Sequence, residues 1–149
     1  MKPDALVREY LLGDAQTMQL ATVANGKPWV ASVYFVADNE LNVYWLSWPE
    51  RRHSREIAAN VNVAATVAIK SDSPVIGVQL EGEAYEIIDS AIVADVMKRY
   101  ITKYDAGKEF VTNFQKGINH HKLYKLVPST IQLFDEVNFL HQSPLQMAL

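Results

Sequence analysis

The chain has 149 residues, 49% of them hydrophobic and 21% charged, a composition that suits one domain with a substantial core and excludes wholesale disorder. The net charge of -3 and the isoelectric point near 5.8 argue against a general nucleic-acid or anionic-membrane surface. The absence of cysteine excludes disulfides, thiolate chemistry and cysteine-ligated metal centres.

The first third of the chain predicts one helix and three strands. An amphipathic pattern predicts the helix over 3–12. Segments rich in aliphatic and aromatic residues predict strands over 17–24, 28–37 and 41–47, and Asn25-Gly26 indicates a hairpin between the first two. Because short polar turns join these strands, we expect an antiparallel meander.

A helix over 50–60 is predicted after the third strand, because Pro49 suits its start and Glu50 its first turn. Basic or imidazole side chains crowd its first turns, where positive charge opposes the helix dipole. They are Arg51, Arg52, His53 and Arg55. An anion such as phosphate would remove this conflict. The open alternative is a surface helix whose charges are only solvated.

The rest of the chain predicts three more strands and two more helices. The strands are expected over 61–70, 75–88 and 121–134, and the helices over 90–104 and 108–116, with a turn at 105–107 between them. Gly77 and Gly82 indicate bulges, and Pro128 indicates a bend in the last strand. Residues 138–149 are expected to be loosely ordered or bound to a partner.

Six strands with helices inserted between them predict an all-β core within an α+β protein, built as a small antiparallel barrel. We expect one domain over 1–149, with a core at about 5–137 and a tail at 138–149. The N-terminus is too charged for a signal peptide, and no apolar run reaches the ~18 residues that span a bilayer. A cytoplasmic protein with no membrane or nucleic-acid partner is therefore expected.

Other catalytic and metal-binding patterns find no support in the sequence. His120 and His121 are adjacent, but no HExxH motif or carboxylate cluster accompanies them, so no metal site is expected. The GxSxG, P-loop and GxGxxG motifs do not occur. Nucleophilic hydrolysis and nucleoside-triphosphate chemistry are therefore not expected.

A family resemblance rests on the run from the strand ending at Ser47, through Arg52-His53, to Asn60 and Val63-Ala64, and on the sequence GVQLEGE at 77–83. This run resembles the phosphate-binding segment of pyridoxamine 5'-phosphate oxidase-like proteins, the FMN-binding split barrels. It is most similar to a small single-domain branch in which Arg-His replaces Arg-Lys. The resemblance covers about residues 5–137 and implies a six-stranded antiparallel split barrel of Greek-key type with flanking helices.

The resemblance also implies a site for FMN. Arg52 and His53, with backbone amides near the end of the third strand, would take the phosphate. The flavin ring would meet the backbone of two strands and one glutamine side chain, at Ser32, Val33, Tyr34, Leu46, Ser47 and Gln79. For Val33, Tyr34 and Leu46 the alternative is ordinary sheet packing. The resemblance assigns no catalytic residue.

The function implied is an FMN-dependent oxidoreductase that works as a homodimer with FMN at the subunit interface. The second chain would contribute to each site, with 134–141 as a candidate segment. The family's Arg and Lys on the second strand align near Ala31 and Val36, so a vitamin B6 phosphate is not the expected substrate. Two alternatives stay open, namely a non-catalytic module that binds or stores flavin, deazaflavin or haem, and a structural protein with an empty cleft.

Overall fold

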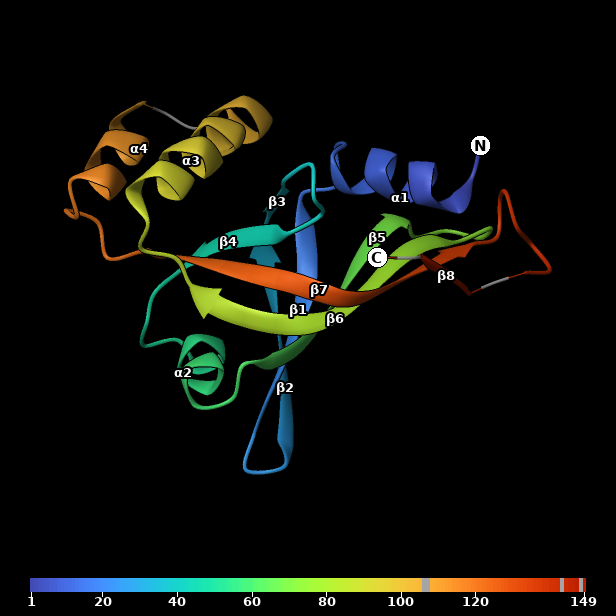
Figure 1. Ribbon diagram of the computed structural model, residues 1–149, viewed down its shortest axis with the longest axis horizontal. Helices are drawn as coiled ribbons and strands as arrows, with labels where there is room; N and C mark the ends of the chain where they lie inside the picture. The colour runs from blue at the N-terminus through green and yellow to red at the C-terminus, as the bar shows by residue number, and fades with distance from the viewer. Residues whose placement is uncertain (106–107, 143, 148) are drawn as a thin grey trace.

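The structure, a computed structural model, describes residues 1–105, 108–142, 144–147 and 149 (Figure 1). Within these residues one antiparallel sheet of eight strands is flanked by four helices. The strands are β1 (Thr17–Ala24), β2 (Lys27–Tyr34), β3 (Val36–Ala37), β4 (Val43–Ser47), β5 (Asn62–Lys70), β6 (Ile76–Glu86), β7 (Lys122–Asp135) and β8 (Leu145–Met147). The helices are α1 (Pro3–Leu11), α2 (Arg52–Ala59), α3 (Ser90–Tyr104) and α4 (Lys108–Gln115).

The sheet curls into a split barrel because its two edge strands, β2 and β3, are consecutive parts of one chain segment. The strand order is β2-β1-β5-β6-β7-β4-β3, and β8 pairs with β7. Phe35 alone separates β2 from β3, so this segment pairs with β1 through its first part and with β4 through its last two residues. The predicted split barrel is thus confirmed.

Two details of the predicted sheet are wrong. The first three strands do not form a simple meander, because β4 pairs with β7 and with the short β3, not with the body of β2. The described sheet also has eight strands where six were expected. One extra strand arises because the segment 28–37 divides at Phe35, and the other is β8.

Alternate side chains of the strands fill the barrel. In β5, buried and exposed residues alternate from Asn62 to Ala68, as a strand with one face toward a core requires. Trp45 lies fully buried near the centre and stacks on Tyr124, with ring centroids 5.9 Å apart and planes 14° apart. Helix α1 covers one end of the barrel with Val7 and Leu11 (Figure 1).

Helix α3 packs at the junction between β2 and β3. Asp89 caps it, since its side chain accepts hydrogen bonds from the amides of Ala91 and Ile92. The buried side chains of α3 form a second apolar cluster with the strands beside them. This cluster comprises Val96, Met97, Tyr100, Val111, Val36, Tyr44 and Leu123. Of the turn expected at 105–107, residues 106 and 107 lie outside the described part of the chain.

Both predicted bulges occur. The β5–β6 register shifts between Ala68 and Lys70, opposite Gly77, and the β6–β7 register shifts at Gly82. A Cβ atom at Gly82 would lie 2.0 Å from the carbonyl oxygen of Val127. Any larger residue there would force β6 and β7 apart, so the close approach explains this glycine.

The tail is more ordered than expected. Residues 145–147 form β8, which pairs with 131–133 of β7. Met147 is only 5% exposed and belongs to the barrel core. An apolar side chain in that position stabilises the end of the chain by burial.

Candidate functional site

A cavity of about 620 Å³ lies where the end of β2, the end of β4 and the start of α2 meet. Seven of the eight residues predicted to bind the cofactor line it. They are Ser32, Val33, Tyr34, Leu46, Ser47, Arg52 and His53. Five further residues complete the lining, namely Trp29, Ala31, Trp48, Arg51 and His121. We call this space the α2 cavity.

The barrel closure explains why these distant segments meet. The end of β2 lies next to β4 because the chain crosses at Phe35 from the β1 side of the sheet to the β4 side. Val33 is 9% exposed and its side chain belongs to the barrel core, so only its backbone remains for a ligand. Tyr34, by contrast, is 62% exposed and contacts the ring of Tyr104 edge-on.

His53 and Ser47 form a buried pair in the wall of the α2 cavity. His53 Nε2 lies 2.7 Å from Ser47 Oγ, and both residues are buried. Burial, aided by the charge of Arg51, lowers the pKa of His53, which favours a neutral imidazole at pH 7. The sequence left the charge of His53 open, and the structure favours an uncharged hydrogen-bonding group here.

Arg52 is held by two neighbours, Glu56 and Trp29. Its Nε donates to Glu56 at 2.9 Å, and its guanidinium lies 4.2 Å from the ring centroid of Trp29. Glu56 also accepts a hydrogen bond of 2.7 Å from Thr22. These contacts fix the cation beside the cavity while leaving its side chain 40% exposed.

Arg51 lines the same cavity, although the sequence named it only among the basic residues of the helix start and not among the cofactor contacts. Helix α2 begins at Arg52, so Arg51 is its N-cap residue. Glu50, which was expected inside the helix, lies before it and pairs with His120 at 2.7 Å. None of the described side chains caps α2, and its first turn contains no acidic residue. The later helix start is what places Arg51 beside the first-turn amides.

Trp48 and His121 form the far rim of the α2 cavity. The guanidinium of Arg51 lies 4.9 Å from the ring centroid of Trp48, and the ring of His121 meets that indole edge-on at 6.1 Å. Nδ1 of His121 is buried and has no hydrogen-bond partner within the described chain. The sequence offered no signal for this position beyond a pair of adjacent histidines.

Gln79 is the predicted residue that lies elsewhere. It is exposed on the outer face of β6, between the buried Val78 and Leu80, and pairs across the sheet with Thr66 and Gln132. It lines a separate shallow cavity of about 420 Å³ on that outer face. Within one chain, the structure does not bring Gln79 to the other seven residues.

These observations define a class of protein. It is an antiparallel split barrel that closes beside a helix whose N-terminus is basic and has no side-chain cap. Within that class, residues 5–135 match the family model described as "Pyridoxamine 5'-phosphate oxidase". The chain therefore belongs to this family, as predicted. Comparison with curated proteins gives no significant match.

Solved structures agree on the fold. The conserved hypothetical protein Rv2991 from Mycobacterium tuberculosis has a TM-score of 0.79 at 14% identity, over 100% of this chain and 92% of that one. HutZ, the haem storage protein from Vibrio cholerae, has a TM-score of 0.70 at 22% identity, over 91% and 95%. Atu2129, of unknown function, from Agrobacterium tumefaciens, has a TM-score of 0.72 at 20% identity, over 89% and 57%.

The present chain thus spans little more than half the length of the Agrobacterium protein. At identities this low, the likeness to solved structures supports the fold alone. Across the described residues, no helix combines the length and the apolar character needed to cross a membrane.

Proposed function

We propose that the protein binds FMN in the α2 cavity and serves as a flavin-dependent oxidoreductase. The observation that carries the proposal is the convergence of two arginines on an uncapped helix start, in a cavity of about 620 Å³. Cavities of this size suit small-molecule cofactors. Basic residues at the positive end of a helix are unfavourable alone, and a phosphate turns them into binding groups.

The phosphate would contact Arg51, Arg52 and the first amides of α2. Arg52 keeps terminal guanidinium N–H groups beyond the Nε that it donates to Glu56, and a guanidinium suits bidentate contact with phosphate. His53 supports the site differently from the phosphate-binding role first assigned to it. A neutral imidazole bonded to Ser47 adds no charge, but it fixes the hydroxyl at the end of β4.

The flavin ring would lie along the backbone of 32–34 and 46–47, with Trp29 and Trp48 as its apolar contacts. Both indoles are 42% exposed, and each already stacks on an arginine at the cavity rim. Bound flavin supplies the capacity to accept and donate electrons, and the protein supplies binding and orientation. Ala31 adds no charge to the lining, which favours a substrate without a phosphate group at this position.

The protein is further proposed to be a homodimer with FMN at the interface. The outer face around Gln79 supports this, since it combines small and apolar side chains with glutamines and threonines that can pair across a twofold axis, and it carries one carboxylate, Glu81. In that assembly Gln79 would face the partner chain, which accounts for its distance from the α2 cavity.

Haem binding without catalysis is the second candidate. It is supported by the unpartnered, buried Nδ1 of His121 in the same cavity and by the likeness in fold to a haem storage protein. Neutral imidazole is a common haem ligand. Purified protein with a Soret band that His121→Ala abolishes would favour haem, and flavin absorbance that His121→Ala leaves intact would favour FMN.

Titration of FMN and riboflavin into apoprotein tests the primary proposal, because the two ligands differ only by the phosphate. Arg51→Ala and Arg52→Ala should each weaken FMN binding about tenfold and leave riboflavin nearly unchanged. Arg55→Ala is the matched control, since Arg55 lies on the same helix, donates to the Glu50 carbonyl and does not line the cavity. Equal loss for both ligands would argue against a phosphate contact. If FMN binds but is neither reduced by NAD(P)H nor turned over with oxygen, the protein would be a store for FMN and not an oxidoreductase.

A further inference from the structure

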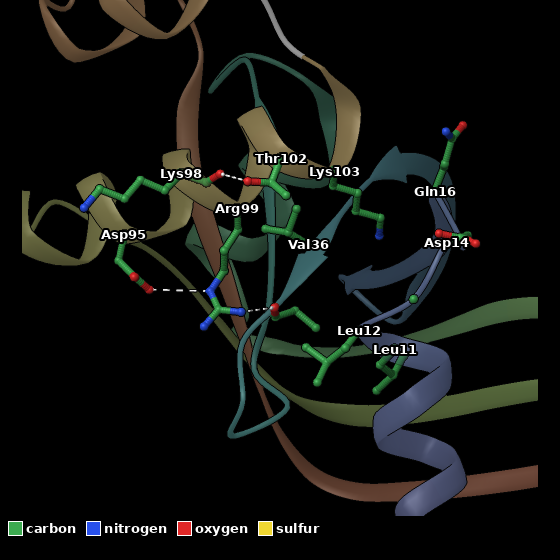
Figure 2. Close-up of a pocket in the computed structure, with 12 residues that line it drawn as sticks. Leu11, Leu12, Asp14, Gln16, Val36, Asp95, Lys98, Arg99, Thr102 and Lys103 are labelled. Atoms are coloured by element: carbon green, nitrogen blue, oxygen red, sulfur yellow. Dashed lines mark hydrogen bonds and ion pairs between the residues drawn. The ribbon is translucent and has the colours of Figure 1, made fainter.

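A second cavity lies between the end of α1, strand β3 and helix α3. Figure 2 shows the twelve residues that line it, and its volume is about 690 Å³. None of these residues lines the α2 cavity. We call it the α3 cavity, and nothing in the proposed flavin chemistry uses it.

Two cations of α3, Arg99 and Lys103, line the α3 cavity and are held by neighbouring backbone carbonyls. Lys103 Nζ donates to the carbonyl oxygen of Phe35 at 3.0 Å. Arg99 Nη1 donates to that of Ala37 at 3.2 Å (Figure 2). These carbonyls are two residues apart on one segment, so roughly 7 Å separates the two points at which the cations are held. An ammonium has three N–H donors and a guanidinium has five, so both retain donors for another acceptor.

Arg99 also shows incomplete hydrogen bonding. Its Nε is buried and forms no hydrogen bond to any described residue, although the carboxylate of Asp95 lies 3.5 Å away. Asp95 is 66% exposed, so water competes for that carboxylate. A ligand acid group inside the cavity would meet less competition from solvent.

The remaining walls combine an apolar floor with few opposing charges. Leu11, Leu12 and Val36 form the floor. The lining contains three basic residues, Lys98, Arg99 and Lys103, against two acidic ones, Asp14 and Asp95. Lys98 extends away from the space between the other two cations (Figure 2). Lys103 is partly buried, and that burial lowers its pKa to about 8, while Asp14 acts in the opposite direction.

We propose that the α3 cavity binds a small organic acid. Its carboxylate or phosphate lies between Lys103 and Arg99, and its apolar part covers Leu11, Leu12 and Val36. Hydrogen bonds between charged groups supply much of the affinity, and the floor selects acids that carry a hydrocarbon part. The competing interpretation is that the two cations only attach α3 to the carbonyls of β3.

Three matched probes test the ligand class by isothermal titration on the full chain, namely hexanoate, hexyl phosphate and the uncharged hexanamide. We expect saturable binding of an acidic probe, about tenfold tighter than that of the amide. The tighter of the two acids identifies the acid group. Equal binding of the amide, or no saturable binding of either acid at millimolar concentration, would overturn the proposal.

Variants locate the site. Lys103→Met should weaken the preferred acid about tenfold, and Leu12→Glu should do the same by placing a carboxylate on the floor. Leu12 is 44% exposed, so this second variant keeps the test valid if loss of Lys103 impairs folding. Lys98→Met makes the same charge change on the same helix and should have little effect. A loss with Lys98→Met equal to that with Lys103→Met would contradict the proposed site.

The pH dependence separates binding at Lys103 from a general charge effect. The charged and titratable groups near it are Asp14 from the α1–β1 loop and Asp95, Arg99 and Tyr104 from its own helix. Burial lowers the pKa of Lys103 to about 8, whereas it raises that of Tyr104 to about 12. Affinity should therefore fall as the pH rises through about 8 in the natural chain and stay level in Lys103→Met. A parallel fall in both would count against the site.

Discussion

The two cavities lie on opposite sides of Phe35 and use positive charge in opposite ways. Before Phe35, β2 lines the α2 cavity, where Arg51 and Arg52 crowd the positive end of a helix that no described side chain caps. After Phe35, β3 lines the α3 cavity, where Lys103 occupies the last turn of its helix and donates to a strand carbonyl.

This difference in position on the helix indicates which basic residues are stabilised by binding an anionic ligand. Basic residues at a helix N-terminus oppose the dipole, so a stable fold that keeps them gains from an anion. A basic residue at a helix C-terminus is favourable by itself, and carbonyl contacts give it a structural role. The α2 cavity therefore suits a doubly charged phosphate, whereas an acid in the α3 cavity must compete with contacts that already exist.

Replacing Phe35, the residue between the strands that line the two cavities, should have the largest effect. Its side chain is fully buried, and Lys103 Nζ lies 3.9 Å from its ring centroid. Phe35→Ala removes core packing where the barrel closes, so the free energy of unfolding should fall by about 3–5 kcal/mol in urea denaturation. Tyr34→Ala is the control, because Tyr34 is 62% exposed. An equal loss for the two variants would mean that closure does not depend on Phe35.

Ser47→Ala tests the buried pair of the α2 cavity and should have the next largest effect. The variant leaves Nε2 of His53 without its partner at 2.7 Å, which should lower the free energy of unfolding by about 1–3 kcal/mol. Ser32→Ala removes a hydroxyl from the same cavity, but that hydroxyl accepts an exposed hydrogen bond from Gln19. It should therefore change stability by less than about 0.5 kcal/mol.

The charge of His53 gives a prediction about pH. The pKa of His53 in the folded protein lies below the ordinary value of about 6.5. Just below pH 6.5, His53 is therefore protonated in the unfolded chain more than in the folded chain. Stability should be unaffected by this group above about pH 6.5 and should fall as the pH drops below it. Histidine NMR titration measures the pKa directly. His121 also has a lowered pKa, so His53→Gln should reduce the acid sensitivity without removing it.

Most of the barrel was predictable from the sequence because its strands follow a local pattern. Alternating burial marks β1 and β5, Asn25-Gly26 marks the hairpin, and Gly82 marks the bulge beside β7. The pairing of β4 was not predictable from such patterns. The chain crosses the barrel at Phe35, a residue with no turn signal, and only the three-dimensional closure of the sheet shows this.

The candidate site was predictable to a similar extent and for related reasons. Residues 32–34, 46–47 and 52–53 were expected from the family resemblance, and they line one cavity. Arg51 was counted among the basic residues of the helix start but not among the cofactor contacts, because the helix was expected to start at Glu50, which pairs with His120 instead. His121 reaches the cavity from just before β7, a contact between distant segments that no local pattern indicates. Gln79 lies on the outer face, since Val78 and Leu80 occupy the core.

Glu56→Gln should have the smallest effect and would sharpen the contrast between the cavities. Glu56 is the carboxylate that holds Arg52, and the hydrogen bond from Arg52 is the main cause of its lowered pKa. Glutamine keeps an acceptor for Arg52 but removes a negative charge that repels a phosphate at the same guanidinium. FMN should therefore bind about threefold tighter at low salt, riboflavin binding should not change, and the gain should shrink as ionic strength rises. Weaker FMN binding would instead show that the carboxylate matters more for orienting Arg52 than for its charge. In that case Arg52, like Lys103, would already have a structural partner before any ligand arrives.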